Sequence, residues 1–296
     1  MTMPATSTLF TPSLVNDLFS KVKGHSSLAT LSGQTPVAFN GNKEFTFSMD
    51  AELDIVAEGG AKTHGGITLE PVTIVPIKFE YGARVSNEFM YATEEEQIAI
   101  LQAFNDGFAK KVASGLDIAA MHGLNPRTGA ASTVVGTNNF DSKVTQTVSY
   151  VAASIDSNIE SAIALVEGSD GDITGLAMST DARQALAALK NSANERLYPE
   201  LAWGGQPNTI NGLAVDVNRT VAKHASGADT DHVIVGDFAN AFKWGYAKEI
   251  PLRVIEFGDP DNSGKDLAGH NEVYLRAEVF LGWGILNPAS FARVKA

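Results

Sequence analysis

Two acidic loops carry the residue types that bind calcium. Asp170-Gly171-Asp172 opens a stretch whose twelfth residue is Asp181. Asp259-Pro260-Asp261 opens another, and its twelfth residue is His270. Calcium loops of this length alternate oxygen ligands and close on a bidentate Glu, which neither stretch has; the first also has Ala177 where an apolar anchor is usual. We therefore predict solvated turns and no metal site, and a calcium-binding α/β module is the weaker alternative.

Side chains with nucleophilic or general-base chemistry do not converge on a catalytic pattern. Ser20 and Lys23 have the SxxK spacing of penicillin-binding enzymes, but the supporting motifs are missing. The six histidines, at positions 25, 64, 122, 224, 232 and 270, never pair at i, i+4. GxSxG, HExxH, the phosphate-binding loop and GxGxxG are missing as well. We therefore predict that the protein is not an enzyme and that it has no cofactor.

Charge and composition argue against a protein that binds nucleic acid or a membrane. In 296 residues without cysteine, 22 Lys and Arg oppose 34 Asp and Glu, which gives a formal net charge of −12. Binding to DNA of any sequence, or to an anionic membrane, needs Lys and Arg, so this balance argues against both. The first residues lack a signal-peptide pattern, and no apolar run approaches the roughly 20 residues of a membrane helix. We expect a soluble protein that is made in the cytoplasm.

Residues 44–56 alternate apolar and polar side chains more cleanly than any other segment, which predicts a half-buried strand. After a glycine-rich turn, alternation resumes over 67–85, where Pro71 and Pro76 indicate an edge strand. Together the two segments predict a hairpin much longer than ordinary ones. A two-stranded ribbon alone is marginal in water, so its apolar face must pack on something, and a neighbouring subunit is the natural candidate.

The remaining elements combine helix and strand. Helical spacing predicts a short helix over 14–22 and a long one over 93–121, with Thr93 as the N-cap and an apolar stripe that includes Phe104. Helix and strand alternate over 150–250, where strands are predicted at 173–178, 210–217, 233–235 and 252–257, and helices at 155–166 and 180–190. A long strand over 273–285 is expected to return to the sheet beside the long helix.

This order of elements, together with several short motifs, resembles the major capsid protein of tailed double-stranded-DNA bacteriophages, the Hong Kong 97 fold. The motifs are 56–62 (VAEGGAK), 76–79 (PIKF) with 84–88 (RVSNE), 234–238 (IVGDF), and the ending from 274–278 (YLRAE) to 288–291 (PASF). Each is moderately specific, and the set spans nearly the whole chain from residue 40. The predicted fold class is α+β.

The resemblance implies a division of the chain. Residues 1–40 would be an N-terminal arm, and 41–85 an extended loop built as a β-hairpin. Residues 86–149 with 265–296 would form a peripheral domain with a spine helix at 93–121. Residues 150–264 would form an α/β axial domain, which clusters around five-fold and six-fold positions.

The resemblance also implies partners. Copies of the chain would form pentamers and hexamers in an icosahedral shell, which encloses double-stranded DNA without reading its sequence. A portal protein, a separate scaffolding protein and a decoration protein are the further partners expected, with assembly in the host cytoplasm and no membrane partner. An encapsulin-like bacterial compartment, which loads a cargo enzyme, is the alternative within the same fold.

The subunit interface is expected along the hairpin and its base. The candidate residues are Phe45, Phe47, Leu53, Ile55, Glu58, Lys62, Ile67, Leu69, Arg84 and Glu88. Some members of the family crosslink a loop Lys to an Asn of a neighbour; Lys62 matches that position only loosely, and an ordinary ion pair is the simpler expectation. Lys62 and His64, near the hairpin tip, form a pair that could contact a neighbouring chain.

Overall fold

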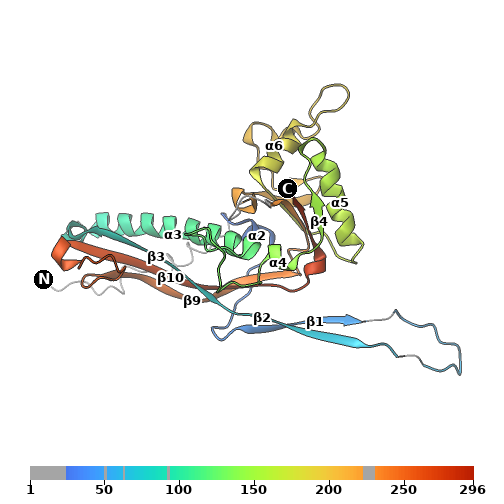
Figure 1. Cartoon of the computed structure of the whole chain (residues 1–296), viewed down its shortest axis with the longest axis horizontal. Helices are drawn as coiled ribbons and strands as arrows, with labels where there is room; N and C mark the ends of the chain where they lie inside the picture. The colour runs from blue at the N-terminus through green and yellow to red at the C-terminus, as the bar shows by residue number, and fades with distance from the viewer. Residues whose placement is uncertain (1–24, 50–51, 63, 92–93, 223–230) are drawn as a thin grey trace.

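The computed structural model describes residues 25–49, 52–62, 64–91, 94–222 and 231–296. Figure 1 shows an elongated body, a compact lobe at one end of it, and a ribbon that projects beyond both. The described strands form a two-stranded ribbon, a three-stranded sheet in the body and a six-stranded sheet in the lobe. This mixture of helix and sheet confirms the predicted fold class.

The ribbon consists of β1 (Asn42–Met49) and β2 (Ile67–Ile74), which pair antiparallel along their whole length. The predicted strand over 44–56 is too long, because β1 ends at Met49 and residues 52–57 belong to no strand. The predicted return strand is also divided at Val75-Pro76. β2 pairs with β1, whereas the next strand, β3 (Ile77–Ser86), pairs with β10 (Glu272–Ile285) of the body. A proline between the strands, without an N–H to donate, suits this change of partner.

The body is a three-stranded antiparallel sheet in the order β3-β10-β9, where β9 spans Phe242–Ile255. α3 (Glu94–His122) lies along this sheet (Figure 1), so the long helix predicted over 93–121 is confirmed, and Thr93 lies outside the described residues. Its apolar stripe is buried at Leu101, Phe108, Val112, Leu116 and Ala119. Phe104 is only half-buried, and it packs against Tyr81 with ring centroids 5.9 Å apart.

The lobe contains a six-stranded mixed sheet in the order β4-β11-β8-β5-β7-β6. Its strands are β4 (Thr147–Ser149), β5 (Gly175–Met178), β6 (Thr209–Ile210), β7 (Leu213–Val217), β8 (Asp231–Gly236) and β11 (Phe291–Lys295). α5 (Ile155–Glu167) and α6 (Thr180–Ala188) pack with it in a separate hydrophobic core. The predicted strand over 210–217 is interrupted by a turn at Asn211-Gly212, where both residues have positive φ.

The sheets divide the chain differently from the predicted segments. β9 belongs to the body, although its residues fall within 150–264. β4 and β11 belong to the lobe, although they fall within 86–149 and 265–296. Strand pairing brings these distant segments together, and the linear order of the elements does not reveal it.

The N-terminal segment contacts both the body and the lobe. The predicted helix over 14–22 lies outside the described residues, and α2 (Ser27–Leu31) was not predicted. The following residues run along β9, where Thr35 N–H donates to the Trp244 carbonyl (2.8 Å) and Val37 N–H to the Tyr246 carbonyl (3.3 Å).

Short elements complete the fold. They are α4 (Phe140–Lys143) and the 3₁₀ helices η1 (Asn87–Tyr91), η2 (Ala152–Ser154), η3 (Pro199–Gly204), η4 (Arg219–Ala222), η5 (Ala268–His270) and η6 (Pro288–Ser290). Among the described residues, no helix combines the length and apolar character needed to cross a bilayer.

Candidate assembly surface and buried polar clusters

The ribbon exposes a row of large apolar side chains. Phe45 and Met49 of β1 are 60% and 67% exposed, and the side chains of Ile67 and Leu69 on β2 are similarly open. Phe47 faces Leu69 and Met49 faces Ile67 in the register, and directly opposed residues lie on one face of a sheet. The side chain of Phe47 itself is outside the description. Among the residues that the structure describes, one apolar face of the ribbon therefore meets no partner at Phe45, Met49, Ile67 and Leu69.

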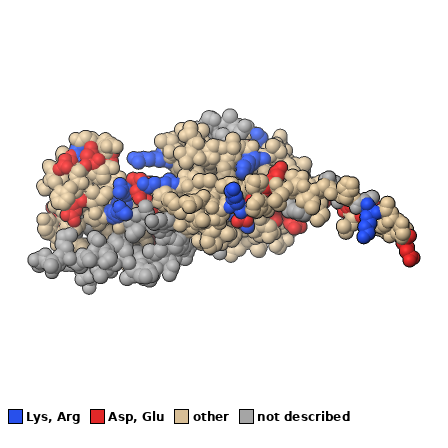
Figure 2. Space-filling model, turned by 90° about the horizontal axis from the view of Figure 1, so that it is seen from below, with Lys and Arg blue, Asp and Glu red and all other residues tan. Residues whose placement is uncertain are grey.

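The segment beyond the strands is more open still. Leu53 is 94% and Ile55 is 97% exposed, and Glu58 and Lys62 are exposed near the tip. In Figure 2 the ribbon leaves the body as a thin extension, with few charged side chains except near its far end. The structure does not bring these residues together with Arg84 and Glu88, which lie on β3 and η1 of the body.

The base of the ribbon is fixed to the body. Ile74, the last residue of β2, is only 1% exposed, and a Cβ added at Gly284 of β10 would lie 2.8 Å from its Cγ1. The Lys243 ammonium on β9 lies 2.9 Å from Oε2 of Glu44 on β1. A glycine at this close approach and one ion pair across the junction therefore set the direction in which the ribbon projects.

Arg84 occupies the second acidic loop. Its guanidinium lies 2.9 Å from Asp259, 2.6 Å from Asp261 and 2.9 Å from Glu272. The hydrogen bond from Arg84 lowers the pKa of the Asp261 carboxyl, and those to Asp261 and Glu272 raise the pKa of Arg84. The cation at this loop is thus supplied by the chain, which supports the turn and not the calcium site. Glu88, by contrast, is exposed.

The first acidic loop is a turn between α5 and β5. Asp170 has a φ of 53°, and the Gly171 N–H donates to the Val166 carbonyl at 3.0 Å, so the backbone reverses tightly here. The side chains of Asp170 and Asp172 are exposed. Both observations fit the solvated turn that the sequence predicted.

A buried carboxylate, Asp117 on α3, was missed from the sequence. It is fully buried, and it accepts hydrogen bonds from Ser26 Oγ (2.5 Å), the Ser27 N–H (2.9 Å), the Leu28 N–H (3.3 Å) and Thr220 Oγ1 (2.8 Å). Burial raises its pKa to about 6, against the lowering by these hydrogen bonds. These hydrogen bonds therefore join the start of α2 to α3. No sequence motif marks Asp117, because its partners are distant in the chain.

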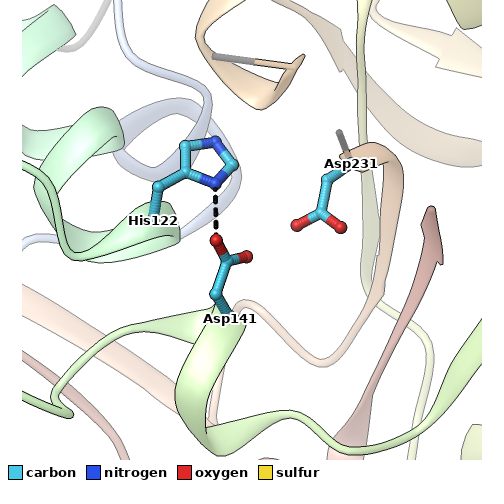
Figure 3. Close-up of side chains that lie close together, drawn as sticks. All are labelled: His122, Asp141 and Asp231. Atoms are coloured by element: carbon cyan, nitrogen blue, oxygen red, sulfur yellow. Dashed lines mark hydrogen bonds and ion pairs between the residues drawn. The ribbon is translucent and has the colours of Figure 1, made fainter. Parts of the chain in front are cut away.

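A second missed cluster joins the body to the lobe. Figure 3 shows His122, Asp141 and Asp231 pointing toward one another from α3, α4 and β8. His122 Nδ1 lies 3.1 Å from Asp141 Oδ2, and Nε2 lies 3.0 Å from the Thr220 carbonyl. Arg293 of β11 forms ion pairs with both carboxylates.

The charges of this cluster are satisfied by protein groups. Burial lowers the pKa of His122, but the hydrogen bond to Asp141 and the negative charges of Asp141 and Asp231 together outweigh it, and the net shift is upward. Burial raises the pKa of Asp231, although Arg293 opposes the shift. His, Asp and Asp in one place could ligate a metal ion. The Arg293 guanidinium already supplies the positive charge, so the arrangement fits a structural ionic cluster and not a metal centre.

A profile of the phage capsid family matches residues 7–296. The chain belongs to the phage capsid family. A structure from Mycobacterium phage Ogopogo is similar at 32% identity, covering 92% of this chain and 92% of that chain with a TM-score of 0.78. One from Gordonia phage Cozz is 27% identical over 91% and 86% of the two chains, with a TM-score of 0.75. No curated protein matches.

The shared fold extends to more distant capsids. The capsid of an empty GTA particle, computed with C5 symmetry, is 17% identical over 92% of this chain and 90% of that chain, with a TM-score of 0.62. At this identity the likeness concerns the fold alone.

The predicted resemblance, the fold class and the function as a major capsid protein of an icosahedral shell are confirmed. Membership of the phage capsid family places the chain in the capsid of the virion, in a structural role.

Proposed function

We propose that each copy of this capsid protein holds the shell together by laying its ribbon on a neighbouring copy. The contact would use the apolar face of β1 and β2 and the unpaired segment that follows them. The observation that carries the proposal is the near-complete exposure of two large apolar side chains, Leu53 and Ile55. The apolar cores of the body and the lobe, by contrast, are buried.

Energetics support a partner for this face. Fully burying one Leu, Ile, Phe or Met side chain contributes about 1.5–3 kcal/mol, and the ribbon exposes several in a row. Exposed contiguous apolar patches of this kind mark interaction sites on proteins. Because the base of the ribbon is held by Ile74 and the Lys243–Glu44 ion pair, a neighbour would meet the face in one fixed orientation.

The finer arrangement follows the same proposal. The body, with β9 included, would be the peripheral domain, and the lobe, with β4 and β11 included, the axial domain of pentamers and hexamers. The shell would enclose double-stranded DNA, and the net charge of −12 disfavours adhesion of that DNA to the wall. A separate scaffolding protein, a portal protein and a decoration protein complete the proposed partners, with assembly in the host cytoplasm.

The double variant Leu53→Ser with Ile55→Ser tests the ribbon contact. Since both side chains are solvated in the single chain, we expect its thermal unfolding to be unchanged and the yield of shells, counted by electron microscopy, to fall at least tenfold. Val134→Ser is the matched control, because Val134 is also strongly exposed but lies outside the ribbon. Normal shell yield from the double variant would overturn the proposal.

A further inference from the structure

A continuous series of buried polar groups joins the N-terminal segment to the lobe. Its central member is Thr220 of η4, which lies between β7 and β8 and is 4% exposed. The Thr220 hydroxyl donates to Asp117 Oδ2 (2.8 Å), and the Thr220 carbonyl oxygen lies 3.0 Å from His122 Nε2. Asp117 and His122 both lie near the C-terminal end of α3, and both are buried. One residue of η4 therefore contacts two buried ionisable groups of the same helix.

The start of α2 is held at the Asp117 end of this series. The Asp117 carboxylate accepts from Ser26 Oγ and from the N–H groups of Ser27 and Leu28. Ser27 Oγ also donates to Asp216 of β7, so α2 is bonded to both the body and the lobe. Burial raises the pKa of Asp117 to about 6 against these hydrogen bonds. Above that pH its buried charge depends on each of its donors.

Strands of the lobe are held at the His122 end. His122 Nδ1 lies 3.1 Å from Asp141 Oδ2 of α4 (Figure 3). Arg293 of β11 forms ion pairs with Asp141 and with Asp231 of β8. Among the described residues, these two carboxylates and this guanidinium are the charged groups that face the imidazole. His122 therefore lies where α3, α4, β8, β11 and η4 meet.

The protonation state of His122 follows from its neighbours. Burial raises the pKa of Asp141, but His122, Asp231 and Arg293 together lower it by more, so this carboxylate is ionised. The two ring nitrogens of His122 thus face a carboxylate oxygen and a carbonyl oxygen, which only accept. An imidazole that donates from both nitrogens carries a positive charge. The pKa of His122 agrees, since burial lowers it but the hydrogen bond to Asp141 and the two negative charges raise it by more.

Rising pH removes the proton on Nε2 before the one on Nδ1. A hydrogen bond to a charged carboxylate is stronger than one to a neutral carbonyl, so Nδ1 keeps its proton for Asp141. The lone pair of Nε2 then faces the Thr220 carbonyl oxygen at 3.0 Å, and two buried acceptors repel each other. Because the pKa of His122 in the folded chain lies above its ordinary value of 6.5, this contact is complete below pH 6.5. It is lost as the pH rises through the folded pKa.

We propose that Thr220 transmits the loss of this proton to α2, so that alkaline pH loosens the N-terminal segment and the joint between body and lobe together. When η4 moves away from His122, the Thr220 hydroxyl leaves Asp117. The buried Asp117 charge then loses one of its four donors. Water must solvate that charge instead, which opens the bonds at the start of α2. The network lies within one chain, so the inference is independent of the ribbon contact between copies.

NMR of the unassembled full chain, with ¹⁵N-labelled histidine, measures the protonation of His122. The two imidazole nitrogens report their protons separately, and the difference between wild type and His122→Gln identifies their signals. We expect both nitrogens to be protonated at pH 7 and Nε2 to lose its proton first at higher pH. A neutral His122 at pH 7, or loss of the Nδ1 proton first, would overturn the inference.

Hydrogen exchange at Ser27 and Leu28 measures the effect on α2. Each exchange rate is divided by the intrinsic rate at the same pH, which removes the pH dependence of the chemical step. We expect protection at both amides to fall about tenfold, with the same midpoint pH as the loss of the Nε2 proton. Protection at Ala162, inside α5, should stay unchanged. Different midpoints for the imidazole and the two amides would show that the ends of the network are not coupled, and the inference would be wrong.

Asp141→Asn shifts the switch without removing it. The amide oxygen still accepts from Nδ1, but the negative charge that favours the imidazolium is gone. The midpoints of His122 and of the α2 amides should therefore move to lower pH together, by about one unit. Asp170→Asn is the matched control, because it removes an exposed carboxylate and should move neither midpoint. Movement of only one midpoint in Asp141→Asn would contradict transmission between them.

Thr220→Val cuts the connection itself. Valine keeps the carbonyl that His122 contacts and removes the hydroxyl that Asp117 accepts from. The α2 amides should lose protection at every pH, while the midpoint of His122 stays in place. A fall in protection that still follows His122 in this variant would show another route and overturn the role of Thr220. If a variant does not fold, the coincidence of the two wild-type midpoints decides the question.

Discussion

Buried charges, and not catalytic groups, are the polar side chains that this fold organises most closely. Asp117 accepts four hydrogen bonds within the chain, and Arg293 joins two carboxylates beside His122. Removing one partner of such a buried group leaves the other uncompensated, which costs more than the intact pair contributes. At this scale the clusters hold α2, α3 and the lobe in their mutual positions.

Asp117→Asn is predicted to change how stability depends on pH. The pKa of Asp117 is about 6 in the folded chain and about 3.9 when unfolded. The stabilisation that the folded state gains by protonating it is therefore complete below pH 4 and is lost as the pH rises through 6. The amide does not titrate, and one of its N–H groups faces a donor, so at pH 4 we expect it to cost about 1–3 kcal/mol.

The measured quantity is the difference in the free energy of unfolding between Asp117→Asn and wild type. From pH 4 to pH 7 the free energy of unfolding of Asp117→Asn should rise relative to wild type by up to about 3 kcal/mol. Urea unfolding of the unassembled chain, followed by circular dichroism across this range, measures it. Parallel pH profiles for the two proteins would contradict the assigned burial of Asp117.

Sequence reasoning at the residue scale succeeds where chemistry is local. It predicts the turn at 170–172, which the structure has, and it predicts no calcium site at 259–261, because a closing Glu is missing at a fixed spacing. It cannot supply Arg84 as the partner of Asp259, since the two are 175 residues apart. The pairing of β3 with β10 sets that contact, along with the loop that precedes β10.

Elements with a long, regular pattern are predicted well. α3 and β10 match their expected ranges almost to the residue, because many periods of burial define each of them. Alternation alone, however, identifies a face and not a partner, so the strand predicted over 44–56 ends at Met49, where pairing with β2 ends. β4 and β11 have only three and five residues, and β11 is buried along most of its length, so neither shows a period.

Gly245→Ala is predicted to detach the N-terminal segment from β9. A Cβ at this position would lie 1.7 Å from the Thr35 carbonyl oxygen, so the backbone must move and the hydrogen bond from Thr35 N–H to Trp244 is lost. We expect a destabilisation of about 1–3 kcal/mol and faster hydrogen exchange at Thr35 and Val37. Gly107→Ala is the contrast, because open space surrounds that exposed glycine of α3 and its φ is not positive. Unchanged exchange at Thr35 would show that the segment is held elsewhere.

At the scale of the whole molecule, folding and assembly use different residues. The three hydrophobic cores lie in the body and the lobe, and among the described ribbon residues 42–74 only Ile74 is a buried apolar side chain. The ribbon therefore adds little to the stability of the single chain. Family membership was recognisable from the sequence because motifs are ordered along the whole chain, whereas sheet membership depends on long-range pairing.

Shortening the ribbon is predicted to abolish shell assembly while leaving the folding of the single chain nearly unchanged. Replacement of residues 46–70 by Asn-Gly, a sequence that favours a two-residue hairpin turn, retains Glu44 and Ile74 at the base. Since the removed side chains make little contact with the cores, the free energy of unfolding should change by less than about 1 kcal/mol. Shells should be absent by electron microscopy and light scattering, because the apolar face that would bind a neighbour is gone. A folded variant that still forms shells would mean that contacts of the body and lobe suffice, whereas an unfolded variant would mean that the ribbon contributes to the core.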